Sequence, residues 1–493
     1  MSRSEHHVVV VGGGIAGLAA AWELSGGADP DPDAPRVTVL ESSRRLGGPL
    51  YSVPFAGRVV DVGPDGFLGR RPEAAELCRE IGVGDRLRAI GASGASVYAR
   101  GKLRALPTAL LLGVPTRWWP TARSGILGPA GSLRLLVDAV VPRTDRRGPL
   151  GDRALGPLVA RRLGRRVVAA LVDPLVGGIH AGSVTDMSTA AVLPQLLAVP
   201  RRGSLMRALR RAATSGPEGS LPEGAGLVAP AFWSLDGGMS VLIDGLEAAL
   251  GSRGVALRSG VAAEALRRDG GGDWTVTTSA GPLRADGLVL ATPAPVVAQL
   301  LEPHDPDAAA LERTVEYGSV AVVTLAYPDG AVSLPPGTGF LVARGTRSPL
   351  PDAGHDDLLV TAGTFLDVKW PHLRRDGTVL LRASVGRFGD RRAERLGDDE
   401  LSARVAAELG AILSVTAPPS ATMVTRWPAI FPQYKVGHLL RVSGIEAAVR
   451  RLPALAVAGS PYRGVGIPAC VGSGRAAARD LLESLGGGLL ARP

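Results

Sequence analysis

The first residues whose types and spacing suit ligand chemistry are three glycines near the start of the chain, in the pattern Gly12-x-Gly14-x-x-Gly17. They follow the apolar run 8–11, which predicts a buried parallel strand, and they precede the stretch 18–24, which predicts a helix. In such a turn the first glycine permits the tight bend, the second lets a pyrophosphate approach the backbone, and the third lets the helix pack closely on the strand. The motif predicts a dinucleotide site, for FAD or NAD, with a glycine-rich turn of another α/β fold as the alternative. The residues expected at this site are Gly12, Gly13, Gly14, Ile15, Ala16 and Gly17.

An acidic residue ends the second predicted strand. Residues 36–40 (RVTVL) form that strand, and Glu41 follows it directly. A carboxylate at this position is expected to accept hydrogen bonds from the adenosine ribose hydroxyls, with Ser42 as a neighbouring contact. The distance from the first strand is slightly long because the polar, proline-rich loop 26–35 intervenes. Strand, glycine turn, helix and strand together predict a βαβ unit.

Two further turns follow the acidic residue. Arg45-Leu46-Gly47-Gly48 supplies a second glycine pair, which suggests another pyrophosphate contact with Arg45 as the counter-charge. The second turn, Gly63-Pro64-Asp65-Gly66, would bring backbone close to a flat ring system. The alternative interpretation of this second turn is an ordinary β-turn without a ligand.

The end of the chain carries another strand, turn and helix. An apolar strand is predicted over 454–458, Gly459 follows it, and a helix is predicted from about Ala469. The N-terminus of that helix would direct amides and the positive end of its dipole at the N1/O2 edge of a flavin, where reduction places negative charge. NAD enzymes need no such second site, so this pattern favours FAD; a plain strand-to-helix connection is the alternative. The candidate cofactor contact at the start of this turn is Gly459, and the Gly464-x-Gly466 pattern follows it.

The stretches between these motifs predict the remaining elements. Residues 72–82 predict a helix, several short helices are expected between 103 and 200, and strands are expected at 255–258, 274–278 and 283–290. Strands at 319–326, 339–343, 358–366 and 378–386, with a helix over 398–413, predict an antiparallel sheet. Because the last strand and helix resemble a return to the opening βαβ unit, the chain is predicted to begin and end in one domain.

Composition limits the class of protein. The 493 residues are 45% hydrophobic and 20% charged, which suits a globular chain of two to three domains. The net charge of +9 fits general solubility, a site for an acidic small molecule, or contact with an anionic membrane surface, while the dispersed basic residues argue against nucleic acid. The two cysteines are far apart and the seven histidines lack metal-ligand spacing, so neither a disulfide framework nor a metal site is expected. No apolar run reaches the length of a membrane span, and the protein is predicted to be cytoplasmic or peripheral at the membrane.

With these motifs in place, the chain resembles the protoporphyrinogen/coproporphyrinogen oxidase family, within the wider amine-oxidase-like flavoproteins. The resemblance extends over nearly the whole chain, and its segments 177–188 and Pro432-Gln433-Tyr434 are the more specific to this family. The other segments that carry it are Gly12–Leu18, Arg45–Gly48, Gly63–Leu68, 174–176, Asp236–Leu246, Lys369-Trp370-Pro371, Arg426-Trp427-Pro428 and Gly464–Pro468.

The resemblance implies an α/β fold in three parts. A Rossmann-like FAD-binding domain is expected from 1–92, 205–300 and 436–493, an α+β substrate domain from 301–435, and a helical domain that faces substrate and membrane from 93–204. The resemblance also implies that the backbone of Val261 lies near the adenine and that Trp427, Val465, Gly466 and Ile467 lie near the flavin. Core packing is the alternative role for Trp427.

The family reaction removes six electrons from a porphyrinogen in three two-electron rounds, with hydride passing from a meso carbon to flavin N5 and oxygen yielding hydrogen peroxide. Aromatisation favours this oxidation, so no strong base is required and no catalytic residue is assigned. The substrate carries propionates, which need Arg or Lys partners. Arg70 and Arg71 are the candidates, with exposed surface arginines as the alternative.

Coproporphyrinogen III is favoured over protoporphyrinogen IX as substrate, because the Gly-, Ala- and Arg-rich composition resembles that of high-GC Gram-positive bacteria. Other haem-pathway enzymes are candidate partners. An amine oxidase, a carotenoid desaturase and a non-catalytic escort protein of the same fold are the competing hypotheses. The low aromatic content of 4% counts against the aromatic cage of an amine oxidase, and the intact flavin motifs count against an escort.

Overall fold

The structure is a computed structural model that describes residues 6–139, 151–197, 203–215, 230–269, 273–350 and 356–487. The chain divides into two compact units. The first unit comprises Met1–Ala89, Ala229–Glu316 and Leu439–Pro493, and the second comprises Ile90–Val228 and Tyr317–His438. The first and last segments of the chain therefore share one unit, while the finer division into three domains stays a prediction.

The first unit is built on a five-stranded parallel sheet. Its strand order is β12 (Ala256–Ser259), β2 (Arg36–Glu41), β1 (His7–Val11), β16 (Gly287–Leu290) and β22 (Leu455–Val457). Alternate residues of β1 face opposite layers, with Val8 and Val10 in one apolar core and Val9 and Val11 in another. The direction in which strands are added reverses between β1 and β16, and such a switch point is where open α/β sheets bind their ligands.

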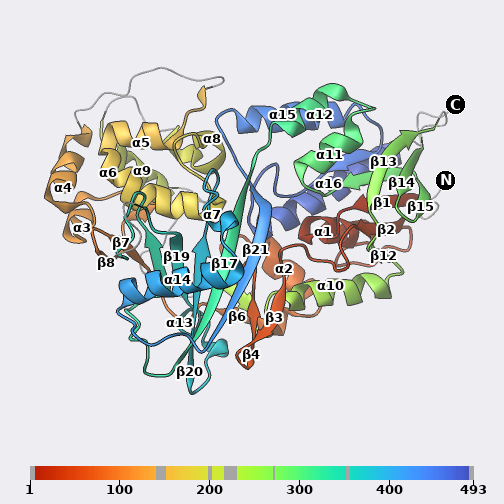
Figure 1. Ribbon diagram of the computed structural model, residues 1–493. Helices are drawn as coiled ribbons and strands as arrows, with labels where there is room; N and C mark the ends of the chain where they lie inside the picture. Colours follow the sequence, from red (N-terminus) through yellow and green to blue (C-terminus); the bar gives the residue numbers. More distant parts are fainter. Residues whose placement is uncertain are drawn as a thin grey trace. The chain divides into compact units, whose positions relative to one another are not determined.

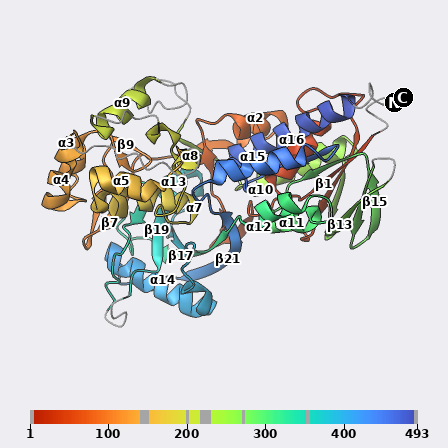
Figure 2. The same cartoon turned by 90° about the horizontal axis from the view of Figure 1, so that it is seen from above.

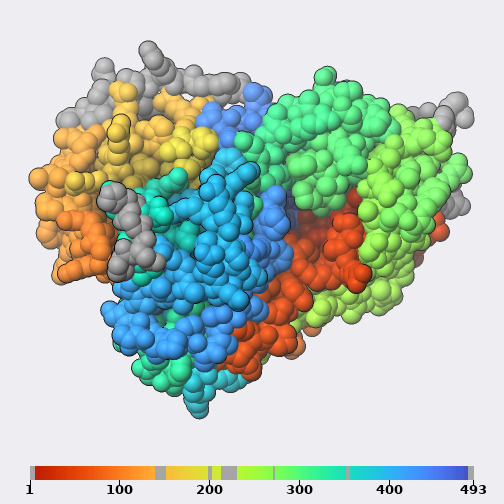
Figure 3. Space-filling view, viewed as in Figure 1, coloured from red at the N-terminus to blue at the C-terminus, as the bar shows by residue number. Residues whose placement is uncertain are grey.

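Helices cover one face of this sheet, and a mixed layer covers the other (Figures 1 and 2). The helical layer consists of α1 (Ile15–Leu24), α2 (Glu73–Glu80), α10 (Ser240–Ser252) and α16 (Ile467–Gly487). The mixed layer consists of the antiparallel strands β13 (Ala263–Arg268), β14 (Trp274–Thr278) and β15 (Gly281–Ala285) with α11 (Ala294–Leu301), α12 (Pro306–Arg313) and α15 (His438–Val449). In the space-filling view, α11 and α12 (green) form part of the surface of the first unit (Figure 3).

The helices α1 and α16 approach each other more closely than side chains would allow. A Cβ atom on Gly474 of α16 would lie 2.0 Å from the carbonyl oxygen of Ala16 in α1. Only glycine fits at such a backbone contact. The contact fixes the last helix of the chain beside the first one.

Most predicted elements of the first unit are confirmed, with one clear error. The single strand predicted over 283–290 is wrong, because the structure has two strands there, β15 and β16, in different sheets. Asp286 separates them, and its carboxylate accepts a hydrogen bond of 2.7 Å from the backbone N–H of His7. The apolar pattern runs through both strands, so it does not reveal where the chain leaves one sheet for the next.

The second unit contains a seven-stranded sheet. Its order is β21 (Ala421–Pro432), β17 (Tyr317–Pro328), β20 (Thr378–Val385), β19 (Val360–Phe365), β18 (Gly339–Val342), β7 (Ser96–Ala99) and β8 (Lys102–Ala105). All neighbours are antiparallel except β18 and β7. Helix α14 (Asp398–Leu413) packs across one face through Leu401, Val405 and Leu409 (Figure 1).

The predicted antiparallel strands and their covering helix are confirmed, but the sheet is larger than expected. Strand β21 was not predicted, and strands β7 and β8 lie within the range expected to be helical. The parallel pairing of β18 with β7 joins residues more than 200 positions apart in sequence. Strand patterns predict local conformation and not partners, so this pairing has no local signal.

The helical part of the second unit packs around a separate apolar core. Its elements are α3 (Trp118–Arg123), α4 (Gly128–Leu136), α5 (Leu155–Leu163), α6 (Arg165–Val167), a π-helix over Val168–Gly177, α7 (Gly178–His180), α8 (Thr189–Val192) and α9 (Leu205–Ser215). The short helices predicted for this region are confirmed. Within the described ranges, no helix combines the length and apolarity that crossing a membrane requires.

Short strands and one short helix complete the two units. Those of the first unit are β3 (Ser52–Phe55), β4 (Arg58–Asp61), β5 (Phe67–Leu68), β6 (Leu87–Ala89) and β11 (Phe232–Leu235), and those of the second are β9 (Leu110–Leu111), β10 (Val114–Pro115) and α13 (Leu366–Lys369).

Candidate functional site

At three positions of the first turn, a side chain would clash with neighbouring atoms of the chain. Gly12 has φ +110°, and a Cβ there would lie 2.5 Å from the carbonyl oxygen of Ala291 at the end of β16. A Cβ on Gly13 would lie 2.4 Å from Cδ2 of Leu46, and a Cβ on Gly17 would lie 1.9 Å from the carbonyl oxygen of Gly12. These glycines therefore allow α1 to start directly at the end of β1.

Gly14 differs from its neighbours because nothing in the described chain needs it to be glycine. It is the N-cap of α1, its φ of −72° suits any residue, and a Cβ there would have no heavy atom within 4 Å. The open space lies at the N-terminus of a ten-residue helix, where free N–H groups and the helix dipole attract an anion. This geometry fits the close approach of a pyrophosphate.

A threonine at the same edge of the sheet was missed in the sequence. Thr292 follows β16, and its Cγ2 would lie 3.0 Å from a Cβ on Gly12. The Oγ1 atom of Thr292 is buried and has no hydrogen-bond partner among the described residues. A buried hydroxyl without a partner is costly, and a ligand oxygen at the switch point would satisfy it. The available signal was a polar residue just after the predicted strand, in Leu290-Ala291-Thr292.

The carboxylate of Glu41 is held at the first turn by backbone amides. Its Oε2 accepts a hydrogen bond of 2.8 Å from Gly13, and its Oε1 accepts one of 2.8 Å from Ser43. Ser42 places its hydroxyl 3.5 Å from Oε1. Val261 donates its N–H to the carbonyl oxygen of Glu41 over 2.8 Å, so the end of β12 lies beside the end of β2. The structure thus brings together the residues predicted to bind ribose and adenine.

The second glycine pair lies directly against the first turn. The N–H of Gly47 donates to the carbonyl oxygen of Gly13 over 2.8 Å, and Gly14 and Gly47 form an isolated parallel bridge. Gly47 and Gly48 have φ values of +94° and +57°, in the region that favours glycine. The role of this pair as another pyrophosphate contact stays a prediction.

The side chain of Arg45 forms hydrogen bonds within its own loop. Its guanidinium donates to the carbonyl oxygens of Leu46 and Gly48, and its Cζ lies 4.1 Å from the centre of the Tyr51 ring. Partial burial of the guanidinium lowers the pKa of Arg45. Its role as counter-charge to a pyrophosphate stays a prediction.

The C-terminal turn reaches the same edge of the sheet. Ala458 donates its N–H to Leu290 of β16 over 3.0 Å, and Gly459, with φ +116°, donates its N–H to Oγ of Ser473 in α16 over 3.0 Å. A Cβ on Gly459 would lie 3.8 Å from Cβ of Ala16. Val465 and Gly466 then lead into α16 at Ile467. The first, second and last glycine turns therefore converge within one unit.

The turn from Gly63 to Gly66 packs beside the second glycine pair. A Cβ on Gly63 would lie 1.9 Å from the carbonyl oxygen of Pro49, and the side chain of Asp65 is buried. Pro64 and Gly66 are partly exposed. The contact of this turn with a flat ring stays a prediction.

The remaining predicted residues lie outside these turns. Arg70 and Arg71 are exposed, and Arg71 forms an ion pair of 2.8 Å with Glu73 of α2. Trp427 is a partly buried residue of β21 in the second unit, where it pairs with Val320 of β17. The roles of Arg70 and Arg71 at propionates and of Trp427 at the flavin stay predictions.

A buried acid behind the C-terminal turn was also missed. Glu312 of α12 is fully buried, and its Oε1 accepts a hydrogen bond of 2.8 Å from the hydroxyl of Tyr462. Its Oε2 has no partner among the described residues. Burial raises the pKa of Glu312 to about 7, against the smaller opposite effect of the Tyr462 hydrogen bond. This pair connects α12 to the segment between Gly459 and Gly466.

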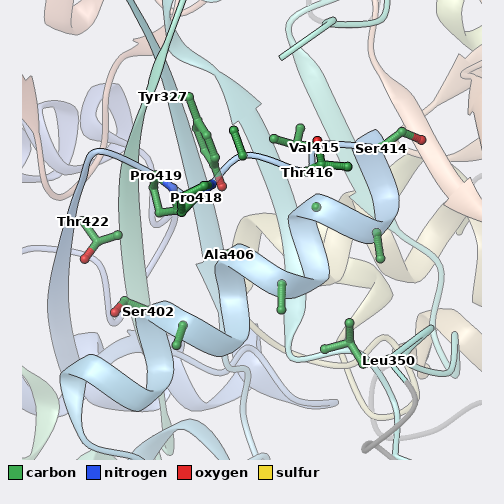
Figure 4. Close-up of a pocket in the computed structure, with 15 residues that line it drawn as sticks. Tyr327, Leu350, Ser402, Ala406, Ser414, Val415, Thr416, Pro418, Pro419 and Thr422 are labelled. Carbon is green, nitrogen blue, oxygen red and sulfur yellow. The ribbon is translucent and has the colours of Figure 1, made fainter. Parts of the chain in front are cut away.

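A cavity in the second unit lacks the groups for such chemistry. It measures about 780 Å³ and lies between α14, the segment after it and the strands that carry Tyr327 and Thr422 (Figure 4). Small apolar and hydroxyl side chains line it, and its one titratable group is Tyr327, whose pKa burial raises to about 12. The converging turns therefore remain the candidate cofactor site.

A comparison with known protein families also indicates a flavin-binding protein. The model of the flavin-containing amine oxidoreductases matches residues 15–482. The chain belongs to this family. The predicted fold class and the FAD cofactor are confirmed, and the protein is an FAD-dependent oxidase.

Several known proteins are similar to this chain over nearly their whole length. A Bacillus subtilis protein named coproporphyrinogen III oxidase is 31% identical over 98% of this chain and 100% of its own. The Mycobacterium tuberculosis protein of the same name is 36% identical over 97% of each chain. A bovine protein named protoporphyrinogen oxidase is 30% identical over 96% of this chain and 98% of its own.

Solved structures agree with the fold. An Exiguobacterium sp. 255-15 protein assigned as a protoporphyrinogen oxidase superposes with a TM-score of 0.82 at 31% identity, covering 97% of this chain and 99% of the other. A UDP-galactopyranose mutase superposes with a TM-score of 0.69 at 16% identity, covering 97% and 96% of the two chains. The second likeness shows the fold alone.

Substituting Gly14 should weaken FAD binding without changing the fold. Gly14→Ala should leave the apoprotein folded, because its Cβ meets open space, and should weaken FAD binding at least about tenfold by occupying the space a phosphate needs. FAD titration of the apoprotein by flavin fluorescence measures this change. The matched control is Gly397→Ala, since Gly397 is also an N-cap with open space around it, at the start of α14. Equal FAD affinity in Gly14→Ala and wild type would contradict the assignment.

Substituting Glu312 should change the pH dependence of stability. The pKa of Glu312 is about 7 in the folded chain, above its ordinary value of 4.5, so ionisation costs stability as pH rises between these values. Glu312→Gln stays neutral, and its free energy of unfolding should exceed that of wild type at pH 8 by up to ~3 kcal/mol, with the difference vanishing near pH 4.5.

Urea unfolding followed by circular dichroism at pH 4.5, 6 and 8 measures this difference. Tyr462→Phe is the control, because it removes the hydroxyl donor and leaves the acid in place. A difference between Glu312→Gln and wild type that is the same at all three pH values would show that Glu312 does not titrate in this range.

Proposed function

We propose that the protein oxidises coproporphyrinogen III to coproporphyrin III in haem biosynthesis, with oxygen as the final electron acceptor. The observation that carries this proposal is the full-length similarity, at 31–36% identity, to bacterial proteins named coproporphyrinogen III oxidase. The intact glycine turns supply the cofactor site that such a reaction requires. The oxidation removes six electrons and six protons from the macrocycle, and three molecules of oxygen take them up as hydrogen peroxide.

The FAD cofactor, when bound, supplies an isoalloxazine ring that accepts two electrons at a time. The chain's own residues would hold and orient it. The turn around Gly14 and the N-terminus of α1 would bind the pyrophosphate, and Glu41 would bind the ribose. The turn from Gly459 to Ile467 would place the N-terminus of α16 at the flavin edge that becomes negative on reduction.

No residue is proposed as a general acid or base. Formation of the aromatic macrocycle drives the oxidation, and the nitrogen protons pass to solvent. The task of the protein is then to exclude competing reactions and to orient a meso carbon, which is a matter of binding geometry.

Coproporphyrinogen III is the proposed substrate because bacterial relatives from Bacillus, Mycobacterium, Propionibacterium and Staphylococcus carry that name. The bovine relative and the Exiguobacterium structure carry the name protoporphyrinogen oxidase instead. The two substrates differ in charge, with four carboxylates on coproporphyrinogen III and two on protoporphyrinogen IX. The net charge of +9 suits the more acidic substrate. The likeness to amine-oxidising enzymes such as putrescine oxidase is only 16% identity and concerns the fold alone.

We further propose that α3 and α4 contact an anionic membrane surface. Trp119, Leu133 and Leu136 are 61%, 62% and 53% exposed, which is unusual for large apolar side chains. Trp118 is fixed by a hydrogen bond of 2.9 Å from its Nε1 to the carbonyl oxygen of Ser132. The stretch from Arg117 to Leu136 contains three arginines and no acidic residue, so its charge complements anionic lipid. Contact with other haem-pathway enzymes is part of the same proposal.

The substrate assignment predicts a preference between porphyrinogens. The purified holoenzyme should oxidise coproporphyrinogen III with a kcat/KM at least about tenfold above that for protoporphyrinogen IX, because the two extra carboxylates add charge-assisted contacts. Porphyrin fluorescence and peroxide release measure both reactions. Equal or faster turnover of protoporphyrinogen IX would reverse the assignment, and a colourless protein unable to bind FAD would favour an escort role.

The membrane proposal predicts binding to vesicles that contain anionic lipid. Co-sedimentation with vesicles of phosphatidylcholine and phosphatidylglycerol should be several-fold weaker for Trp119→Gln than for wild type, since the indole ring supplies apolar area at the interface. Phe232→Gln is the control, because Phe232 is 40% exposed but lies in the other unit. Equal binding of wild type and Trp119→Gln would refute this contact.

A further inference from the structure

A small polar cavity in the second unit has the chemistry of a carboxylate site. It measures about 250 Å³ and is lined by three arginines, Arg344, Arg387 and Arg392, together with backbone of the turns after β18 and β20. Such a volume is below that of sites for whole drug-sized ligands, so the cavity suits one side chain of a larger molecule.

Two of these arginines share a single buried carboxylate. Oδ2 of Asp173, in the π-helix, lies 3.3 Å from Nη1 of Arg344 and 3.5 Å from Nη1 of Arg387. Its Oδ1 accepts a hydrogen bond of 3.0 Å from the N–H of Val184. Each guanidinium has five N–H donors, so a single long contact leaves most of them available. One positive charge of the pair is therefore not balanced by Asp173.

The other charges around the cavity do not supply that balance. Arg392 forms two hydrogen bonds, of 3.0 and 2.7 Å, with Asp390, so these two neutralise each other. Asp357 is exposed, where water and salt screen its carboxylate. Arg387 is only 18% exposed, and its burial lowers its pKa, with the neighbouring charge of Arg344 as the next cause. An anion in the cavity would favour the charged form of Arg387 and offset its repulsion from Arg344.

The cavity lies beside the π-helix and next to Ala181 and Lys435. The N–H of Phe388 donates to the carbonyl oxygen of Ala181 over 2.6 Å, and Arg344 donates its N–H to Ala169 over 2.8 Å. Nζ of Lys435 lies 4.7 Å from the centre of the Phe388 ring. The arginines are thus held beside the π-helix through Asp173, and the neighbouring Phe388 contacts Ala181 and Lys435.

We propose that Arg344 and Arg387 bind a propionate carboxylate of the porphyrinogen substrate in this cavity. The proposal rests on the proposed function and adds the residues that recognise the acidic side chain. Planar guanidinium groups bind carboxylates through paired hydrogen bonds, which makes the site selective for the ionised acid. Arg387, at 18% exposure, is more buried than the exposed sequence candidates Arg70 and Arg71, and Arg344, at 43% exposure, lines the same cavity.

The test compares Arg344→Gln and Arg387→Gln with wild-type holoenzyme. Each variant should raise KM for coproporphyrinogen III about tenfold or more, with kcat within about twofold, because a charge-assisted bond to the substrate is lost while the flavin site is unchanged. Arg391→Gln is the matched control, since Arg391 is 80% exposed, does not line the cavity and forms only one long ion pair, of 3.9 Å with Glu394. An unchanged KM in both variants would overturn the proposal.

A binding measurement separates this proposal from the proposed function. Wild type should bind coproporphyrin III, followed by quenching of porphyrin fluorescence, more tightly than its tetramethyl ester, and Arg387→Gln should lose most of this preference. If wild type binds the acid selectively but does not oxidise the porphyrinogen, the proposed function fails and the carboxylate site stands. If wild type oxidises the porphyrinogen and Arg387→Gln keeps the full preference, the carboxylate site fails alone.

A charge-retaining variant covers the case in which Arg387→Gln does not fold. Arg387→Lys and Arg344→Lys keep the partner charge for Asp173 but lose the planar fork. Each should keep the wild-type melting temperature and FAD content and still raise KM several-fold. A lysine variant with wild-type KM and wild-type preference for the acid over the ester would overturn the proposal.

Discussion

The site depends on contacts between backbones that only glycine permits. The first turn closes because Gly17 lies against the carbonyl oxygen of Gly12, and the last helix joins it because Gly474 lies against the carbonyl oxygen of Ala16. Side chains at either position would force apart β1, α1 and α16. With these contacts in place, the N-termini of two helices from opposite ends of the chain face the carboxyl edge of the same sheet. Two positive dipole ends at one edge suit a cofactor with a pyrophosphate and a ring that gains negative charge.

The sequence predicted those parts of the site that consist of backbone conformation. Glycine spacing, a following helix and a preceding strand are all local, so the turns around Gly14, Gly47 and Gly459 could be located without a structure. The position of Glu41 followed from the end of a strand with a clear apolar pattern. These predictions agree with the structure because each requires only a few consecutive residues.

The parts that escaped prediction depend on residues far apart in the chain. Thr292 matters because β16 lies beside β1, and Glu312 matters because α12 packs behind Tyr462. Neither neighbour is near in sequence. The same applies to Asp173, which is shared by arginines from two other segments, and to β7, which joins a sheet formed mostly by residues after 316. Whether a charged residue is buried cannot be recognised from the sequence while its distant partner is unknown.

The central claim is that the converging turns bind FAD and that this FAD takes electrons from coproporphyrinogen III. Anaerobic mixing of the purified holoprotein with coproporphyrinogen III, followed by absorption spectroscopy, tests it most directly. The account predicts one FAD per chain, loss of the oxidised flavin band on mixing, and its return with porphyrin formation when oxygen is admitted. A flavin band that coproporphyrinogen III leaves unchanged, or a folded protein that takes up no FAD, would contradict it.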